Sequence, residues 1–403
     1  MLIIRLILGY VIAYLSGKLM NKIKLPQILG WLLAGVIFGP NIIGLVSRDV
    51  MALKVFPIIM NLAKSIVGIM VGYGMVFNNI KKAGVKYLTI TLSEIITTMV
   101  FTGVIFAIIF AILGIPWQLA ILCGLVSVPT APGVNLSLIS EFKAKGKFTE
   151  TLRTVTGLNS IFSNLFFYTL LGVVQVTIMN TSEVNISIVD MMVLPLIIGA
   201  IFGVITSKAI CIFKDTSKDL LVFVSFIIIT CSVALYVDNY IIKDPVMNFV
   251  ILGIGFSTAY VNMVKKEKFI SIRKCFNPIQ QKGLMCLVFG LGLPLNPKLI
   301  PEHLFILLAY IIVRGIGKIG GTYFGASLAK EEESIKRNIK YMMLPAAGVS
   351  LVFFSNAAAI VEASFPDFLY IFTVAFPAGV MINDIVGIML GKKAFVRSGE
   401  IDK

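Results

Sequence analysis

Charge is scarce in this 403-residue chain, and carboxylates are scarcer than bases. Asp, Glu, Lys and Arg make up 14% of the residues, against about 25% in ordinary globular domains. There is a single His, at position 303, and the five Cys have no paired spacing. The sequence therefore offers no metal-ligand cluster, disulfide framework or nucleophile motif. We expect neither an enzyme nor a cofactor.

Most of the remaining residues are apolar. They make up 58% of the chain, and the mean hydropathy is +0.96. Runs of about 20 apolar residues, each long enough to cross a bilayer, recur from end to end. The composition predicts an all-α polytopic membrane protein with about 13 transmembrane helices. We expect them near residues 2–20, 25–46, 55–78, 86–113, 117–141, 150–178, 186–207, 219–236, 244–263, 282–297, 303–328, 337–363 and 367–391.

The basic residues that give the net charge of +15 follow an alternating pattern along the predicted spans. Most bases follow odd-numbered spans, as in Lys81/Lys82/Lys86 and Lys143/Lys145/Lys147, and few follow even-numbered ones. The positive-inside rule then places the N-terminus outside and the C-terminus in the cytoplasm, with the protein in the cell membrane. The basic balance indicates contact with anionic lipid and predicts no nucleic-acid partner.

Two membrane spans carry Pro and Gly in their middle. The first has VPTAPGV (128–134) and the second LPAAGV (344–349). The two segments are about 217 residues apart, which also separates the starts of the spans at 86 and 303, and such matched breaks point to inverted repeats around a transport site. Because Pro removes a helix hydrogen bond, we expect broken helices that meet near the midplane. The residues of the breaks are Pro129, Thr130, Ala131, Pro132 and Gly133 in the first, and Pro345 and Gly348 in the second.

Polar and charged side chains gather in the same spans as the breaks. The span at 150–178 contains Asn159, Ser160 and Ser163 with no carboxylate beside them. Polar groups at bilayer depth are costly unless they line a protected cavity. We therefore predict a substrate or ion site formed by these three residues with Thr130, Ala131 and Pro132 of the first break. We also predict a charge network formed by the deep charged residues Glu94, Arg314, Lys318 and Asp384.

The distribution of these residues predicts a division of one membrane domain into two parts. Spans over 2–78 and 219–297 carry almost no deep charge, which is typical of a scaffold. Spans over 86–178 and 303–391 carry both breaks and the four deep charges, and we expect them to form the core. The span at 186–207 would link two inverted six-helix repeats.

Several segments resemble the monovalent cation:proton antiporter superfamily, in particular bacterial sodium/proton and potassium-efflux exchangers. KLPQILGWLLAGVIFGPNIIGL (24–45) is similar to the second helix of that family. VPTAPGVNLSLISEFKAKGKFTETLRTVTGLNS (128–160) is similar to its first broken helix and the helix that follows. IIVRGIGKIGGTYFGA (311–326), YMMLPAAGVSLVFF (341–354) and GIMLGKKAFVRSGEI (387–401) resemble its last three helices.

The resemblance implies a homodimer in which a mobile core of crossed broken helices moves against the scaffold, the elevator type of alternating access. It also implies a monovalent cation, Na⁺ or K⁺, and protons as substrates. The acidic pair, or Asn-Asp, of the family falls on Asn159 and Ser160, and the acidic residue often seen in the first break falls on Ala131. Arg314 and Lys318 match basic positions of the family, and Glu94 matches an acidic one.

Asn and Ser do not titrate, so the site departs from the ordinary mechanism of the family. Three interpretations stay open. Proton coupling has moved to Glu94 or Asp384; or Arg314 and Lys318 serve an anion or small solute; or the chain is a non-transporting regulatory or sensor homologue. The four charges also fit two structural ion pairs, Lys318–Glu94 and Arg314–Asp384.

Overall fold

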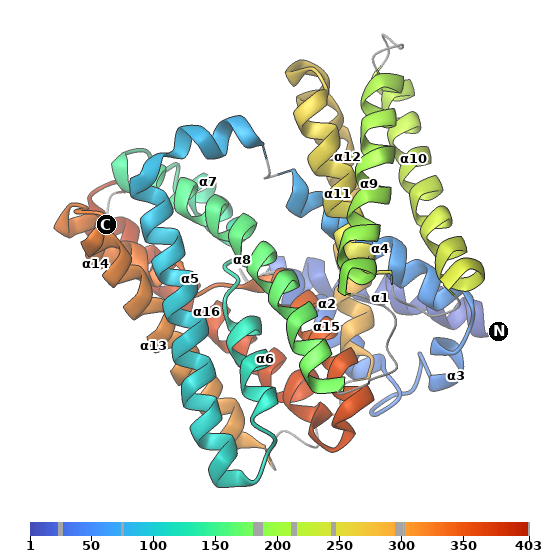
Figure 1. The fold of residues 1–403 in the computed structure, drawn as a ribbon, viewed down its shortest axis with the longest axis horizontal. Helices are drawn as coiled ribbons and strands as arrows, with labels where there is room; N and C mark the ends of the chain where they lie inside the picture. The colour runs from blue at the N-terminus through green and yellow to red at the C-terminus, as the bar shows by residue number, and fades with distance from the viewer. Residues whose placement is uncertain are drawn as a thin grey trace. The chain divides into compact units, whose positions relative to one another are not determined.

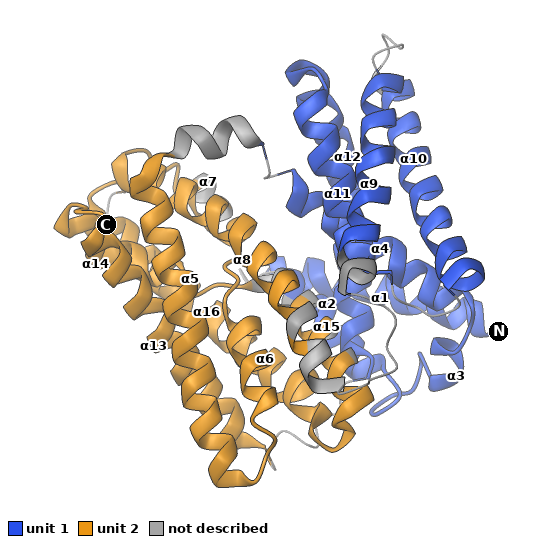
Figure 2. Ribbon diagram, viewed as in Figure 1, with its two compact units in different colours: residues 1–80, 181–294 blue, residues 81–180, 295–403 orange. Residues whose placement is uncertain are grey.

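The computed structural model describes residues 1–22, 27–73, 76–179, 188–210, 216–242, 247–294, 301 and 303–401. Their regular structure is entirely helical (Figure 1). The chain divides into two compact units, each formed by two separate stretches of sequence (Figure 2). Unit 1 contains residues 1–80 and 181–294, and unit 2 contains residues 81–180 and 295–403. Unit 1 includes the spans that we predicted as scaffold together with the span predicted as a linker.

The all-α membrane architecture is confirmed. In the described part of the chain, seven helices are long and apolar enough to cross a membrane, and two shorter apolar helices accompany them. Each of the predicted spans overlaps a helix or a pair of half-helices. The number of membrane crossings and the inverted repeat stay predictions.

Unit 1 is built around α11 (Phe249–Met263), which packs against α4 (Val55–Gly72) and α9 (Ile188–Ile210). Glycine makes these contacts close: a Cβ at Gly253 would lie 2.1 Å from the carbonyl oxygen of Ser65. Small residues bring membrane helices into backbone contact in this way. The other helices of unit 1 are α1 (Leu2–Lys22), α2 (Gln27–Phe38), α3 (Arg48–Met51), α10 (Thr216–Tyr236), the π-helix η1 (Val237–Ile242) and α12 (Lys266–Gly292).

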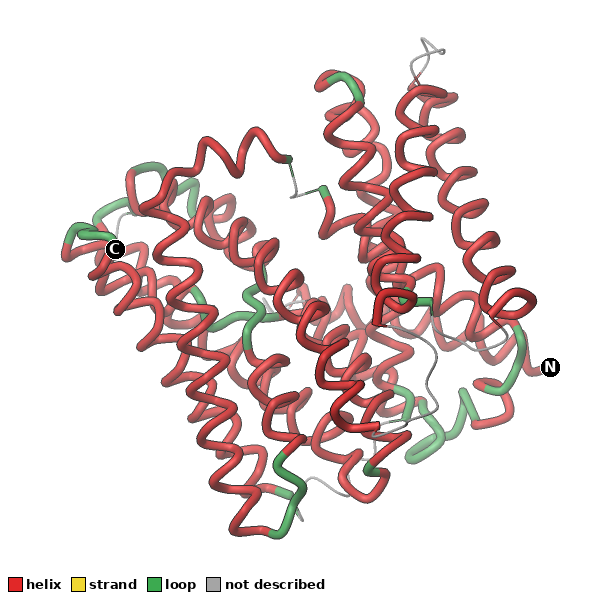
Figure 3. The backbone as a smooth tube through the Cα atoms, in the orientation of Figure 1, coloured by secondary structure: helices red, strands yellow, loops and turns green. Residues whose placement is uncertain are grey.

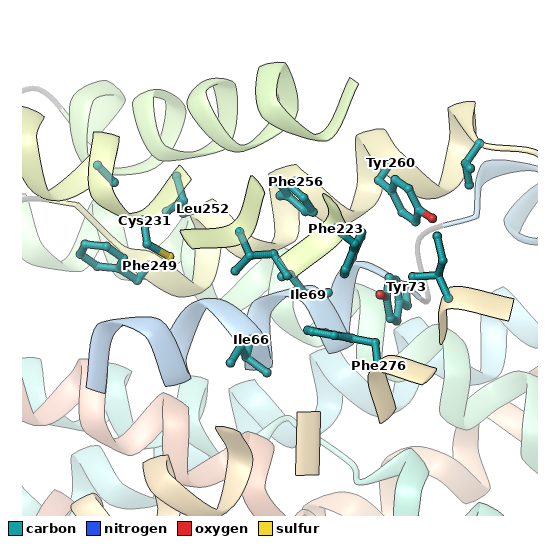
Figure 4. Close-up of a cluster of buried hydrophobic side chains, with 14 of the residues drawn as sticks. Ile66, Ile69, Tyr73, Phe223, Cys231, Phe249, Leu252, Phe256, Tyr260 and Phe276 are labelled. Atoms are coloured by element: carbon teal, nitrogen blue, oxygen red, sulfur yellow. The ribbon is translucent and has the colours of Figure 1, made fainter. Parts of the chain in front are cut away.

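Aromatic side chains fill the interior of unit 1 (Figure 4). Phe223 of α10 lies at the centre, with its ring 5.5 Å from that of Phe256 and 5.1 Å from that of Phe276. Tilted and edge-to-face contacts of this kind add to the packing of buried aromatic rings. Unit 1 therefore has its own apolar core.

The long helices of unit 2 include α5 (Phe77–Leu113), which begins in unit 1 and has a kink at Gly84, and α13 (Leu304–Leu328). On α5 the apolar face is exposed and the polar face is buried, the reverse of a surface helix in a soluble protein. An apolar stripe is exposed, as expected of a surface toward lipid: Ile96, Val100, Val104 and Ile108. A polar stripe on other positions is fully buried: Thr91, Glu94, Thr98 and Thr102. The helix thus carries polar groups, including one carboxylate, into the interior of unit 2.

The remaining helices of unit 2 pack against α13 or against one another. Two are interrupted, as α6 (Gln118–Ser127) with α7 (Pro132–Glu141), and α14 (Glu333–Met342) with α15 (Ala347–Ser364). The others are α8 (Lys147–Met179) and α16 (Phe376–Ser398), preceded by the short helices η3 (Pro366–Phe368) and η4 (Ile371–Ala375). Figure 3 draws both interruptions as loop between helical stretches. The stacked rings of Phe167 and Phe353, 3.7 Å apart, join α8 to α15.

Candidate ion-binding site

The two breaks in unit 2 touch each other. The backbone N–H of Ala131 donates to the carbonyl oxygen of Pro345 at 2.6 Å. The prediction of two non-helical segments that lie close together is confirmed. Their bounds differ from the expected Thr130–Gly133 and Pro345–Gly348, because α7 already begins at Pro132 and α15 at Ala347. Pro132 has no N–H to lose at a first helical position, so it starts a helix where we expected it to interrupt one.

Arg314 of α13 satisfies the carbonyl groups that the breaks leave without helical partners. Its guanidinium donates to the carbonyl oxygens of Ser127 at 3.1 Å, Pro129 at 3.0 Å and Leu344 at 2.8 Å. The side chain is fully buried. A buried backbone carbonyl without a partner is costly, and a planar guanidinium with five donors can serve several at once. Arg314 therefore holds both breaks in place.

Lys318, one turn further along α13, forms an ion pair with Glu94 of α5. The ammonium nitrogen lies 2.6 Å from Glu94 Oε1, and both side chains are 0% exposed. The predicted Lys318–Glu94 ion pair is confirmed. Lys318 also donates to the hydroxyl of Thr130 at 2.9 Å and to the carbonyl oxygen of Val128. Its ammonium group is thus held by three different kinds of oxygen: carboxylate, hydroxyl and main-chain carbonyl.

Asn159 of α8 connects this ion pair to the first break. Its amide Nδ2 donates to Glu94 Oε2 at 2.5 Å, and its Oδ1 accepts from the backbone N–H of Thr130 at 2.9 Å. Thr98 donates to Glu94 Oε1 at 3.3 Å from the next turn of α5. Each oxygen of the Glu94 carboxylate therefore has at least one donor, as a buried charge requires.

Glycine allows α5 and α13 to come close enough for the ion pair. A Cβ at Gly321 would lie 3.1 Å from the Cα of Glu94 and 2.9 Å from the Cβ of Thr97. The GKIGG segment (317–321) therefore acts through close packing, which small residues give to membrane helices. Lys318 follows Gly317 on the same helix and reaches Glu94 across this contact.

The second proposed ion pair is not formed. Among the described residues, no ion pair joins Arg314 to Asp384, because the guanidinium is occupied by the carbonyl oxygens of the breaks. Asp384 Oδ1 accepts instead from the backbone N–H of Ala346 at 2.7 Å, at the start of α15. A carboxylate is favourable at the positive N-terminal end of a helix. Asp384 thus stabilises the second half-helix.

The other predicted site residues lie around this network with smaller roles. Ser163 is fully buried, and its hydroxyl has no hydrogen-bond partner in the described part of the chain. Ser160 is partly exposed, and its backbone carbonyl accepts from Asn164 at 2.6 Å. Ala131 takes part through its backbone alone. The structure therefore brings together Glu94, Thr130, Asn159 and Lys318, and leaves Ser160 and Ser163 outside their hydrogen bonds.

Sequence reasoning missed a polar contact on the other side of the breaks. Asn135 of α7 donates to the carbonyl oxygen of Met342 at 2.8 Å and to the hydroxyl of Thr156 at 3.3 Å. A buried Asn one turn after a break, and a Thr one turn before Asn159 on α8, were the available signals. This contact ties α7 to the end of α14 and to α8.

The arrangement suits a small cation better than a metal centre or an anion. Within the described ranges, no group of three His, Cys, Asp or Glu side chains could hold a metal ion. The oxygens around the Lys318 ammonium come from Glu94, Val128 and Thr130. Hard monovalent and divalent cations take such oxygen ligands. Both bases donate to protein oxygens and so present no free charge to an anion.

Comparison with known proteins gives the family and the fold of the chain. Residues 7–390 match the family described as sodium/hydrogen exchanger, transmembrane. The fold is similar to that of the sodium proton antiporter MjNhaP1 from Methanocaldococcus jannaschii at pH 8, with a TM-score of 0.66, 17% identity, and coverage of 99% of this chain and 95% of that one. An electron-microscopy structure of MjNhaP1 gives a TM-score of 0.64 at 15% identity, covering 98% and 97%. No curated protein matches in sequence.

Proposed function

Because the chain belongs to the transmembrane sodium/hydrogen exchanger family, a family of secondary transporters, we propose that it exchanges a monovalent cation, Na⁺ or K⁺, for protons by alternating access. The observation that carries the proposal is the buried Glu94–Lys318 pair, held at 2.6 Å against the first break. A buried charged pair in a membrane marks an ion pathway by default. In this proposal Glu94 takes the role of the acidic pair of the family, at whose positions this chain has Asn159 and Ser160.

Charge balance gives the coupling. The Glu94 carboxylate and the Lys318 ammonium together carry no net charge. A cation that took the place of the ammonium beside Glu94 would leave one excess positive charge in the membrane interior, which is costly. Release of one proton from Lys318 removes that excess. One bound cation therefore displaces one proton, and the site is neutral in both states.

The oxygens that hold the ammonium are the ligands that the incoming cation would use. Glu94, Thr130 and the carbonyl of Val128 already surround one positive charge. Asn159 keeps the carboxylate and the backbone of the first break in place. With a single carboxylate at the site, we expect weak exchange and a stoichiometry of one cation to one proton.

The anion interpretation has less support. An anion would have to compete with Glu94 for Lys318 and with three carbonyl oxygens for Arg314. Losing those partners would leave the buried carboxylate without its cation and the carbonyls without donors. The geometry therefore favours a cation as the transported ion.

The division into units suggests which part moves. Every residue of the proposed site lies in unit 2. Unit 1 has its own aromatic core and glycine-mediated helix contacts. We infer that unit 2 is the mobile core and unit 1 the scaffold, which joins two copies in a homodimer in the cell membrane, with the N-terminus outside and the C-terminus in the cytoplasm.

Reconstituted vesicles test the proposal. The purified protein is placed in vesicles with an internal pH dye, and gradients of Na⁺, K⁺ or Li⁺ are applied at a clamped membrane potential. We expect a cation-driven pH change whose rate does not depend on the potential. Glu94→Gln should abolish it. Thr91→Val is the matched control, because it removes a buried hydroxyl one turn away whose bond goes to Tyr87 of its own helix.

The same vesicles separate the alternatives. A pH change that survives Glu94→Gln would show that coupling lies elsewhere. Flux of chloride or phosphate without a cation response would favour the anion interpretation. If the native protein moves no ion but Na⁺ or K⁺ still raises its thermal stability, it binds the cation as a sensor, since a ligand of the folded state must stabilise it.

A further inference from the structure

The first turn of α8 is capped by a side chain from the far end of the chain. Glu400 follows α16, and its Oε1 accepts from the backbone N–H of Phe148 at 2.7 Å. Its Oε2 accepts from the backbone N–H of Thr149 at 3.0 Å and from the Thr149 hydroxyl. The N–H groups of a first helical turn have no partners within the helix. One carboxylate here satisfies two of them.

The local sequence of α8 requires this outside help. Gly146 precedes the helix and has no side chain with which to cap it. A Cβ at this position would lie 2.2 Å from Glu400 Oε1, and the φ angle of 155° is one that other residues rarely adopt. Gly146 thus leaves the space that the Glu400 carboxylate occupies. The glycine and the carboxylate fit each other as two halves of one cap.

The face of α8 that this cap begins leads to the ion site. Phe148, Leu152 and Val155 belong to one buried apolar cluster with Phe395 of α16. Their spacing puts them on one side of the helix, and Asn159 continues the same stripe. Asn159 lies ten residues after Thr149, which is roughly 15 Å along a straight helix. Any shift of α8 along its axis therefore moves the amide that bridges Glu94 and Thr130.

We propose that Glu400 is a positioning residue of the ion site. By capping α8 it fixes the axial position of the helix, and with it the placement of Asn159 between the Glu94 carboxylate and the backbone of Thr130. The part of the proposal that concerns cation affinity rests on the proposed function, and the part that concerns the position of α8 does not.

Hydrogen exchange tests the positional part without any transport. In Glu400→Ala, we expect the amides of Phe148 and Thr149 to exchange roughly five- to tenfold faster, as for the loss of a helix cap. The amide of Thr130, which donates to Asn159 Oδ1, should also exchange faster. Glu400→Asp keeps the charge and should restore slow exchange at least in part. Unchanged exchange at Phe148 and Thr149 would overturn the cap, and unchanged exchange at Thr130 would overturn its effect on the site.

Transport kinetics test the effect on affinity. Glu400→Ala should raise the apparent KM for the cation at least threefold while the maximal rate changes less, because Asn159 orients a ligand. Glu332→Gln is the control, since it removes a mostly exposed partner of Lys147 at the same end of α8, and such pairs contribute little. An equal fall in maximal rate at constant KM would contradict positioning. Absence of transport in the native protein would contradict the proposed function. The hydrogen-exchange result would then decide whether Glu400 positions α8.

Discussion

Replacement of Glu94 by Gln is the most direct perturbation of the buried site. The substitution keeps the shape of the side chain and turns one carboxylate oxygen into an amide donor. In the native protein, the two oxygens of Glu94 accept from Lys318 at 2.6 Å and from Asn159 at 2.5 Å. One of these donors would then face another donor, and the Lys318 ammonium would have no anion. Removing one partner of a buried ion pair costs about 3–5 kcal/mol, so we expect that loss in the free energy of unfolding.

The second partner completes a double-mutant cycle. Lys318→Met leaves the Glu94 carboxylate without its cation and should also destabilise strongly. The double variant contains neither charge, so its loss should be smaller than the sum of the single losses. For groups in direct contact we expect the difference to be about 0.5–3 kcal/mol. Exchange should be absent from all three variants, because cation and proton compete at this pair.

The cysteines of the chain supply the assay. Cys123 of α6 is 0% exposed and becomes reactive toward a thiol dye when unit 2 unfolds. Cys275 is exposed and is replaced by Ser to lower the background. Unfolding in mixed micelles then gives the stability of each variant, with Thr91→Val as the buried control. Additive losses in the cycle, or exchange that persists in Glu94→Gln, would refute the reasoning.

Three further predictions address other parts of the molecule. Asp384→Asn should lower the free energy of unfolding by about 0.5–2 kcal/mol, the range for a helix cap, and leave cation-driven exchange in vesicles measurable. Complete loss of that exchange would place the coupling at Asp384. Ser160→Asp should strengthen cation binding, measured as larger thermal stabilisation by Na⁺ or K⁺, because a bound cation would offset the new charge; no gain would contradict the family match at this position. When Cys is placed singly at positions 143, 182, 268 and 298, an impermeant reagent applied to intact cells should label only positions 182 and 298. Ser182 and Lys298 lie outside the described residues, and labelling at position 268 would contradict the predicted topology.

Much of the fold follows from local patterns in the sequence. Apolar runs give the helices, and Pro with Gly gives both breaks, since these signals act within one turn of chain. The bounds of the breaks were shifted by a few residues, because Pro132 starts a half-helix and the non-helical segment precedes it. The Lys318–Glu94 pair followed from the need of each buried charge for a partner.

What the sequence did not predict depends on contacts between distant segments. Arg314 and Asp384 were paired by the same charge argument, but the crossing of the breaks creates unsatisfied carbonyl groups that no local pattern shows. Arg314 goes to those carbonyls and Asp384 to the backbone of Ala346. Likewise, Glu400 binds across 252 positions of sequence, where only the missing cap at Gly146 gave a signal.

The crossing of the two breaks is held largely by main-chain atoms. The bond from Ala131 to Pro345 uses backbone alone, and Arg314 binds only carbonyl oxygens among its described partners. Neither contact depends on the side chains at positions 131, 159 or 160. Positions 131 and 160 can therefore change without loss of the crossing, whereas Asn159 accepts from the backbone N–H of Thr130 in the first break. The ion chemistry of the site can thus be altered by single substitutions while the backbone crossing that carries it stays in place.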